Sequence, residues 1–296
     1  MFGHLLIGQF KKSILLFVLM LVTTLVVACG GGETTSGDPE SSGNEGGNTE
    51  EDKPTLVIGT DAAYPPFESL DPATNEIVGF DVDLIGAVLE EAGYDYEITN
   101  TGWDPLFMSL ENDDIDLGIS AITIDPSRQE SYDFTTPYFE SAQMMLFTEG
   151  TEIETALDLE GKKIGVQSGT TGQFATENVL EELGYSTTEI DEAISHYDST
   201  PVAIMAVTAG ELDVAVIDNT VAEEYVKKNP DSELIAIGDP ENFDPEFYGI
   251  IFKKDNPLRD EVNTALKTII ENGTYAEIFN EWFGYEPDVD TLLNAE

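Results

Sequence analysis

Cysteine, histidine and basic residues are all scarce in this chain of 296 residues. The single cysteine, Cys29, excludes a disulfide framework and a thiolate metal site. The two histidines, His4 and His196, offer no Ser–His or Cys–His pair, so we expect no catalytic residues, no metal and no cofactor, although a carboxylate acid or base stays open. Only 12 lysines and arginines stand against 59 acidic residues, a net charge of −47. Nucleic acid is therefore excluded as a partner, because no basic patch can release counterions from phosphates.

The N-terminal residues 1–28 have the pattern of an export signal. Lys11 and Lys12 precede an apolar run over 14–27 that is short for a membrane span, and small residues then lead to Cys29. This ending resembles the lipobox of bacterial lipoproteins, which implies cleavage before Cys29 and lipidation of its thiol. An uncleaved N-terminal anchor is the less favoured alternative, because three glycines follow at once.

Residues 29–53 are predicted to be a disordered tether. After the cysteine they consist mainly of glycine, serine, threonine and acidic residues, with no apolar residue to bury. Together with the signal, this segment predicts a body that is lipid-anchored at the extracellular face of the cell membrane, or periplasmic. Hydrophobic residues make up 41% of the chain, enough for two modest cores in that body.

From residue 54 onward, apolar runs alternate with helical patterns. This alternation predicts an α/β fold with mostly parallel sheets. The predicted strands cover 55–60, 94–99, 115–122, 163–167, 213–217 and 248–252. The predicted helices cover 81–92, 103–110, a stretch opening at 168–172 and running to about 183, 201–209, 257–270 and 273–283.

Two segments repeat one pattern of helix, turn, Asp-led apolar strand and polar end. They are Leu110–Thr123 and Val207–Thr220. We interpret them as equivalent elements of two lobes. The polar end of each segment is then a place for ligand contacts, since open α/β sheets bind ligands at the carboxyl ends of their strands.

The first candidate binding residue is Arg128, one of only two arginines in the chain. It follows a strand end with small and hydroxylated residues, Ser120, Ala121 and Thr123. A guanidinium beside hydroxyls and free backbone N–H groups suits a carboxylate, which it can hold with two parallel hydrogen bonds. The alternative is that Arg128 merely pairs with a nearby surface acid.

Other strand ends supply further candidates. Asp61 and Tyr64 lie in a proline-stiffened loop after the first strand. Gln167 ends a strand before a Gly/Ser/Thr loop that contains Thr170, and such a loop at a helix N-terminus binds anions. Asp218 ends another strand, and the alternative there is that it only caps the next helix.

Three motifs resemble the polar amino-acid solute-binding proteins of ABC importers. They are GFDVDLIGAVLEEAG, GISAITIDPSRQESYDFTTPY and LKTIIENGTYAEIFNEWFG, and the similarity extends over about residues 55–286. The resemblance implies a two-lobed, periplasmic-binding-protein-like clamshell with two crossover hinge strands. Lobe 1 would comprise 54–141 and 246–296, and lobe 2 would comprise 142–245.

The resemblance also implies roles for the candidates. Arg128 would hold the ligand α-carboxylate, helped by Thr123 and by groups near Ser120, Ala121 and Thr170. Asp218 would bind the α-ammonium, which makes two opposite charges for a zwitterion.

The ligand side chain would meet a different group of residues. Tyr64 and Trp103 would form aromatic walls, and Asp61 would face the far end. Some glutamine binders of the family have a lysine where this chain has Gln167. The two aromatic rings with Asp61 suit a cationic tip or an amide. Arginine or lysine is slightly favoured over glutamine, and cystine stays open.

The function implied is the substrate-binding component of an ABC amino-acid importer. It would deliver a small-molecule amino acid to a membrane permease, act as a monomer and not be an enzyme. The alternatives are a ligand-sensing module for a signalling receptor and a dehydratase-type enzyme related to the family.

Overall fold

The computed structural model of the protein describes residues 54–294. The predicted signal over 1–28 and tether over 29–53, with the proposed lipidation site Cys29, lie outside the described residues. Within 54–294, no helix combines the length and the apolar character needed to cross a membrane.

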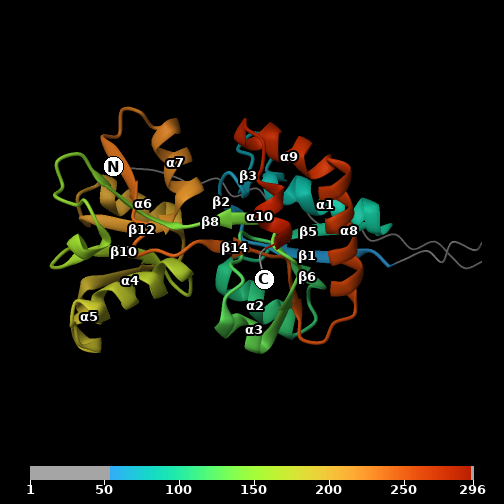
Figure 1. Ribbon diagram of the computed structural model, residues 1–296, viewed down its shortest axis with the longest axis horizontal. Coiled ribbons are helices and arrows are strands. Elements are labelled where there is room, and N and C mark those ends of the chain that lie inside the picture. The colour runs from blue at the N-terminus through green and yellow to red at the C-terminus, as the bar shows by residue number, and fades with distance from the viewer. Residues whose placement is uncertain (1–53, 295–296) are drawn as a thin grey trace, which may run out of the picture. The chain divides into compact units, whose positions relative to one another are not determined.

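Two five-stranded sheets organise the described residues (Figure 1). Their strand orders are β5-β1-β6-β15-β7 and β11-β10-β12-β9-β13. In each sheet the first three strands are parallel and the fourth is antiparallel to both its neighbours, so the predicted parallel pairing holds with one reversed strand per sheet. The strands of the first sheet are β1 (Leu56–Thr60), β5 (Tyr96–Asn100), β6 (Leu117–Gly118), β7 (Tyr132–Phe134) and β15 (Ile251–Lys253). Those of the second are β9 (Gln143–Thr148), β10 (Ile164–Gln167), β11 (Ile194–Tyr197), β12 (Val214–Asp218) and β13 (Leu234–Gly238).

The two repeated segments occupy equivalent places in the two sheets. Each contributes the central strand, β6 in one sheet and β12 in the other. The aspartate before each strand makes the same contact. Asp116 Oδ2 accepts the N–H of Val57 at 2.7 Å, and Asp213 Oδ2 accepts the N–H of Lys163 at 2.7 Å. The prediction of equivalent elements is confirmed.

Two short strands connect the sheets. They are β8 (Phe139–Ser141) and β14 (Glu246–Tyr248), which pair antiparallel and lie between the two larger sheets in Figure 1. We propose the lobe division at these strands: lobe 1 is 54–141 with 246–294, and lobe 2 is 142–245. A small three-stranded sheet contains β2 (Ala63–Tyr64), β3 (Glu68–Leu70) and β4 (Ile77–Val78).

Helices pack on the sheets through buried apolar faces. The helix α1 begins after Gly79, and an added Cβ there would lie 1.9 Å from the carbonyl oxygen of Phe67, so only glycine fits. It ends at Gly93 in a left-handed C-cap. Phe80 opens α1 and contacts the rings of Phe279 and Phe283, which both lie on α9 (Thr274–Phe283). The helices are α1 (Phe80–Ala92), α2 (Trp103–Glu111), α3 (Pro126–Ser131), α4 (Thr171–Glu182), α5 (Thr187–Ala193), α6 (Thr200–Thr208), α7 (Asn219–Lys228), α8 (Leu258–Asn272), α9 (Thr274–Phe283), α10 (Val289–Asn294) and the 3₁₀ turn η1 (Ala156–Leu159).

Several predicted elements differ from the structure. The strand predicted over 115–122 is only β6, because the chain turns at Ala121, whose φ is +46°. The strand predicted over 248–252 is split, since Tyr248 pairs with β8 while Ile251 joins the first sheet. The short helices α3 and α5 were not predicted.

Candidate functional site

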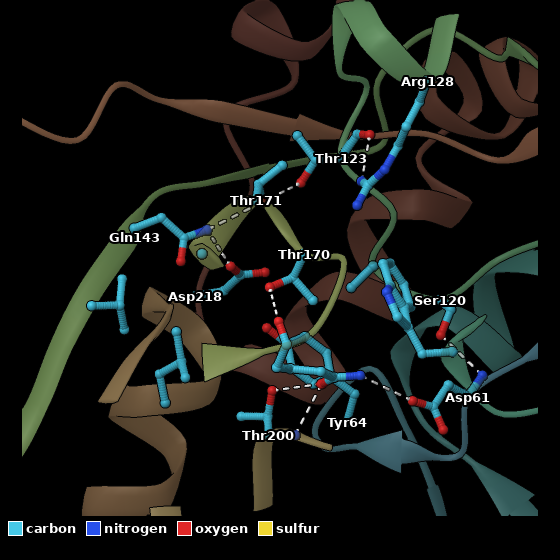
Figure 2. A pocket seen from close by; sticks show the side chains of 16 residues that line it. Asp61, Tyr64, Ser120, Thr123, Arg128, Gln143, Thr170, Thr171, Thr200 and Asp218 are labelled. Atoms are coloured by element: carbon cyan, nitrogen blue, oxygen red, sulfur yellow. Dashed lines mark hydrogen bonds between the residues drawn. The ribbon is translucent and has the colours of Figure 1, made fainter. Parts of the chain in front are cut away.

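One cavity is lined by all ten binding residues predicted from the sequence. The space in it not filled by protein atoms, open solvent at its mouth included, is about 470 Å³. Figure 2 shows the labelled side chains around it. The predicted residues in its lining are Asp61, Tyr64, Trp103, Ser120, Ala121, Thr123, Arg128, Gln167, Thr170 and Asp218.

The sequence Asp125-Pro126-Ser127-Arg128 places the arginine by forming a helix start. The Asp125 carboxylate accepts the backbone N–H groups of Ser127 at 2.8 Å and of Arg128 at 3.3 Å. Pro126 stands at the first helical position, where its missing N–H costs nothing. The cap thus fixes Arg128 in the first turn of α3, from where its side chain reaches the cavity.

Arg128 is buried, with 9% of its surface exposed. Its Nη1 donates to the carbonyl of Thr123 at 3.0 Å, and its Nη2 donates to the carbonyl of Gly169 at 3.1 Å. The guanidinium carbon lies 5.3 Å from the centroid of the Trp103 ring. None of the ion pairs found within 54–294 involves Arg128. The alternative of a simple surface ion pair is therefore wrong for this arginine.

Asp218 ends β12 and is buried within the same cavity lining. Its Oδ1 accepts Gln143 Nε2 at 2.6 Å, and its Oδ2 accepts the hydroxyl of Tyr248. It is the N-cap residue of α7, but its side chain makes no capping hydrogen bond, so the capping alternative is wrong. Burial raises the pKa of Asp218, and its hydrogen bonds and the Arg128 charge oppose that rise.

Asp61 lies across the cavity from Arg128 in Figure 2, and Gln167 contacts it there. Gln167 Nε2 lies 3.5 Å from Asp61 Oδ2, and its amide oxygen accepts two hydrogen bonds from Thr200, at 2.8 and 2.9 Å. The Asp61 N–H donates to Ser120 Oγ at 3.0 Å. Burial raises the pKa of the Asp61 carboxyl, and the hydrogen bond from Gln167 opposes that rise. None of the ion pairs within 54–294 includes Asp61.

Contacts cross between the two proposed lobes around this cavity. Arg128 and Trp103 both donate to the carbonyl of Gly169, the indole N–H at 3.4 Å. Glu246 Oε2 accepts the hydroxyls of Thr123 at 2.9 Å and Thr171 at 2.7 Å. The structure thus has the lobes in contact at the cavity.

Some lining residues were not predicted from the sequence. Thr171 and Gly172 belong to the Gly/Ser/Thr loop over 168–172, but only Thr170 of that loop was predicted to bind the ligand. An added Cβ at Gly172 would lie 2.9 Å from Gln143 Oε1 and 3.0 Å from the carbonyl oxygen of Val216, so this glycine permits close approach. Gln143 and Thr200 do not stand at the carboxyl end of any strand predicted from the sequence. The additional lining residues are Gln143, Thr171, Gly172, Thr200, Val216 and Ile217.

Within 54–294, no group of histidine, cysteine or acidic side chains has an arrangement that could hold a metal ion. The charged side chains in the cavity lining are the Arg128 guanidinium and the carboxyl groups of Asp61 and Asp218. Such a set can bind a small molecule that carries both signs of charge.

Comparisons with known proteins agree on one family. Residues 56–285 match the sequence profile of the bacterial extracellular solute-binding proteins, family 3. The "Probable histidine-binding protein" of Neisseria gonorrhoeae is 34% identical over 231 residues, covering 77% of this chain and 83% of that protein. The arginine-binding extracellular protein ArtP of Bacillus subtilis is 32% identical over 235 residues, covering 79% and 88%.

A solved structure is also similar. The arginine-, lysine-, histidine-binding protein ArtJ of Geobacillus stearothermophilus is 48% identical, with a TM-score of 0.76. The match covers 81% of this chain and 100% of that one. The two-lobed α/β fold predicted from the sequence is confirmed.

Proposed function

Because this chain belongs to the bacterial extracellular solute-binding proteins, family 3, we propose that it binds one cationic amino acid and delivers it to the permease of an ABC importer. It would do so outside the membrane, as a monomer, held by the lipid on Cys29. The relatives compared above bind arginine, lysine or histidine according to their names, which supports the ligand class.

The observation that carries this proposal is that Arg128 and Asp218, which carry opposite charges, line the same cavity. Two of the five N–H donors of Arg128 bind backbone carbonyls, so others are left for a ligand carboxylate. Asp218 supplies the opposite charge for an α-ammonium. Both side chains are buried, and buried charges interact more strongly than exposed ones. A zwitterionic ligand would give Arg128 and Asp218 each a partner of opposite charge.

The charges of the lining support a cationic side chain. Asp61 and Asp218 supply two carboxylates, and Arg128 supplies one cation. A ligand with a net charge of one positive unit neutralises this set, whereas glutamine leaves a carboxylate unpaired in a buried site. The rings of Tyr64 and Trp103 also line the cavity, and such rings attract a cation over their faces. Arginine or lysine is therefore proposed over glutamine.

A thermal-shift screen against the twenty amino acids tests this function. Arginine or lysine at about 100 times its dissociation constant should stabilise the fold by about 2.7 kcal/mol. For a body of this size, that corresponds to a rise in melting temperature of roughly 5–10 °C. Glutamine should give a smaller rise and leucine none. A screen in which leucine stabilises as much as arginine would contradict the proposal.

The same samples separate a binder from an enzyme. A binding protein returns its ligand chemically unchanged after prolonged incubation, as judged by mass spectrometry of the released molecule. Conversion of the ligand into a product would instead support the dehydratase-type alternative.

A further inference from the structure

Two acidic side chains that the proposed function does not use are buried behind the cavity. Glu68 on β3 and Asp81 in the first turn of α1 are each 0% exposed. Glu68 Oε1 accepts the Ser120 hydroxyl at 2.8 Å. Asp81 Oδ2 accepts the Ala121 N–H and the Tyr138 hydroxyl, both at 2.8 Å. The other oxygens, Glu68 Oε2 and Asp81 Oδ1, receive no hydrogen bond from any donor in residues 54–294.

The two carboxyl groups contact each other through their side chains. No ion pair within 54–294 includes either of them. Two carboxylates in contact in a dry interior repel strongly, and each has an oxygen without a donor. A single proton between them removes the repulsion and supplies the missing donor.

The surroundings favour this proton. Burial, followed by the charge of Asp81, raises the pKa of Glu68 well above its ordinary value, and burial raises the pKa of Asp81 as well. Asp61 adds a further negative charge near Glu68. The remaining titratable neighbours are neutral phenols, namely Tyr64, Tyr138 and Tyr275.

We propose that Glu68 and Asp81 share one proton at neutral pH, and that this protonated pair positions the ligand-contacting segment Ser120–Ala121. The pair acts through other residues and touches no ligand itself. Its role in affinity rests on the proposed function, whereas the shared proton does not.

The contacts show how the pair positions the cavity wall. The Ser120 hydroxyl donates to Glu68 and accepts the N–H of Asp61, so one serine ties two cavity segments to the pair. Ala121 has a φ of +46°, a backbone conformation unfavourable for alanine, and its N–H is held by Asp81. Loss of the proton would separate two carboxylates that anchor both residues.

The first test measures proton uptake on folding. The folded pair has a raised pKa, so its stabilisation is fully present below the unfolded pKa values and is lost as pH rises through the folded one. Between the pKa of an unfolded carboxyl, about 4, and the raised pKa of the folded pair, the folding constant of the wild type should therefore fall about tenfold per pH unit more steeply than that of Glu68→Gln. The glutamine amide supplies a permanent donor to Asp81. Glu76→Gln, at an exposed carboxylate in the same lobe, should parallel the wild type.

A second measurement needs only the wild type. Infrared spectra at mildly alkaline pH should show the C=O stretch of one protonated carboxylic acid, which disappears in Glu68→Gln if that variant folds. The ligand affinity of the wild type for arginine should also fall as pH rises through the pKa of the pair, while that of Glu68→Gln stays level over that range.

Three outcomes would overturn the proposal. They are equal pH slopes for the wild type and Glu68→Gln, no acid band in the wild type, or a slope that follows sodium concentration, which would indicate a bound cation. Because unfolding and infrared measurements need no ligand, they decide the shared proton even if arginine does not bind. If the proton is found but affinity is independent of pH, the positioning role is wrong.

Discussion

Arg128→Lys is expected to weaken the binding of arginine or lysine about 100-fold, or ~3 kcal/mol. The lysine keeps the positive charge but loses the planar fork of donors that holds a carboxylate with two hydrogen bonds. It also gives up the contacts that the guanidinium makes with the carbonyls of Thr123 and Gly169. Isothermal titration calorimetry at constant pH measures the loss directly.

The chain offers a matched control in its only other arginine. Arg259 pairs at 3.1 Å with the neighbouring Asp260, and both side chains are exposed. Exposed pairs contribute little, so Arg259→Lys should bind like the wild type. If Arg128→Lys bound as tightly as this control, Arg128 would not be the carboxylate anchor.

Asp218→Asn is expected to weaken binding at least tenfold and to leave more of the protein open. The substitution keeps the shape of the side chain but removes the charge that would attract an α-ammonium. Arg128 belongs to proposed lobe 1 and Asp218 to proposed lobe 2, so neither lobe alone holds a complete zwitterion site. A ligand that contacts both must favour the closed state.

Small-angle scattering measures this closure. Wild type with saturating arginine should have a smaller radius of gyration than without it, and Asp218→Asn should show a smaller change at the same ligand concentration. Asp231→Asn, at an exposed position of the same lobe, serves as the control and should behave like the wild type. An equal radius with and without ligand in the wild type would contradict closure.

Residues at strand ends were the most accessible from the sequence. Asp61 follows β1, Gln167 ends β10 and Asp218 ends β12, and all three line the cavity. Parallel pairing of β10 with β12 places Gln167 and Asp218 at the same edge of the second sheet. The sequence Asp125-Pro126 is also a local pattern typical of a helix start, and it forms the cap that places Arg128. The two segments that share one sequence pattern also predicted equivalent central strands in the two sheets, because a local pattern specifies a local structure.

Contacts between distant segments could not be predicted in this way. Gln143 lies opposite Asp218 because β9 pairs with β12. Tyr248 and Glu246 lie on β14, which pairs with β8, and from there they contact Asp218 and Thr171. No local pattern marks such residues.

Asp81 shows the same limit within a correctly predicted helix. It stands in the first turn of α1, where the helix dipole favours a carboxylate. In the fold it is fully buried against Glu68, because the neighbouring hairpin β3 and the segment after β6 cover it.

The central claim is that the cavity recognises an α-amino acid with a cationic side chain, and calorimetry with arginine and two analogues tests it most directly. Agmatine is arginine without the α-carboxylate, and 5-guanidinopentanoic acid is arginine without the α-ammonium group. Both should bind at least about 100-fold more weakly than arginine, since each leaves Arg128 or Asp218 buried without its partner. Binding of either analogue as tightly as arginine would contradict the account.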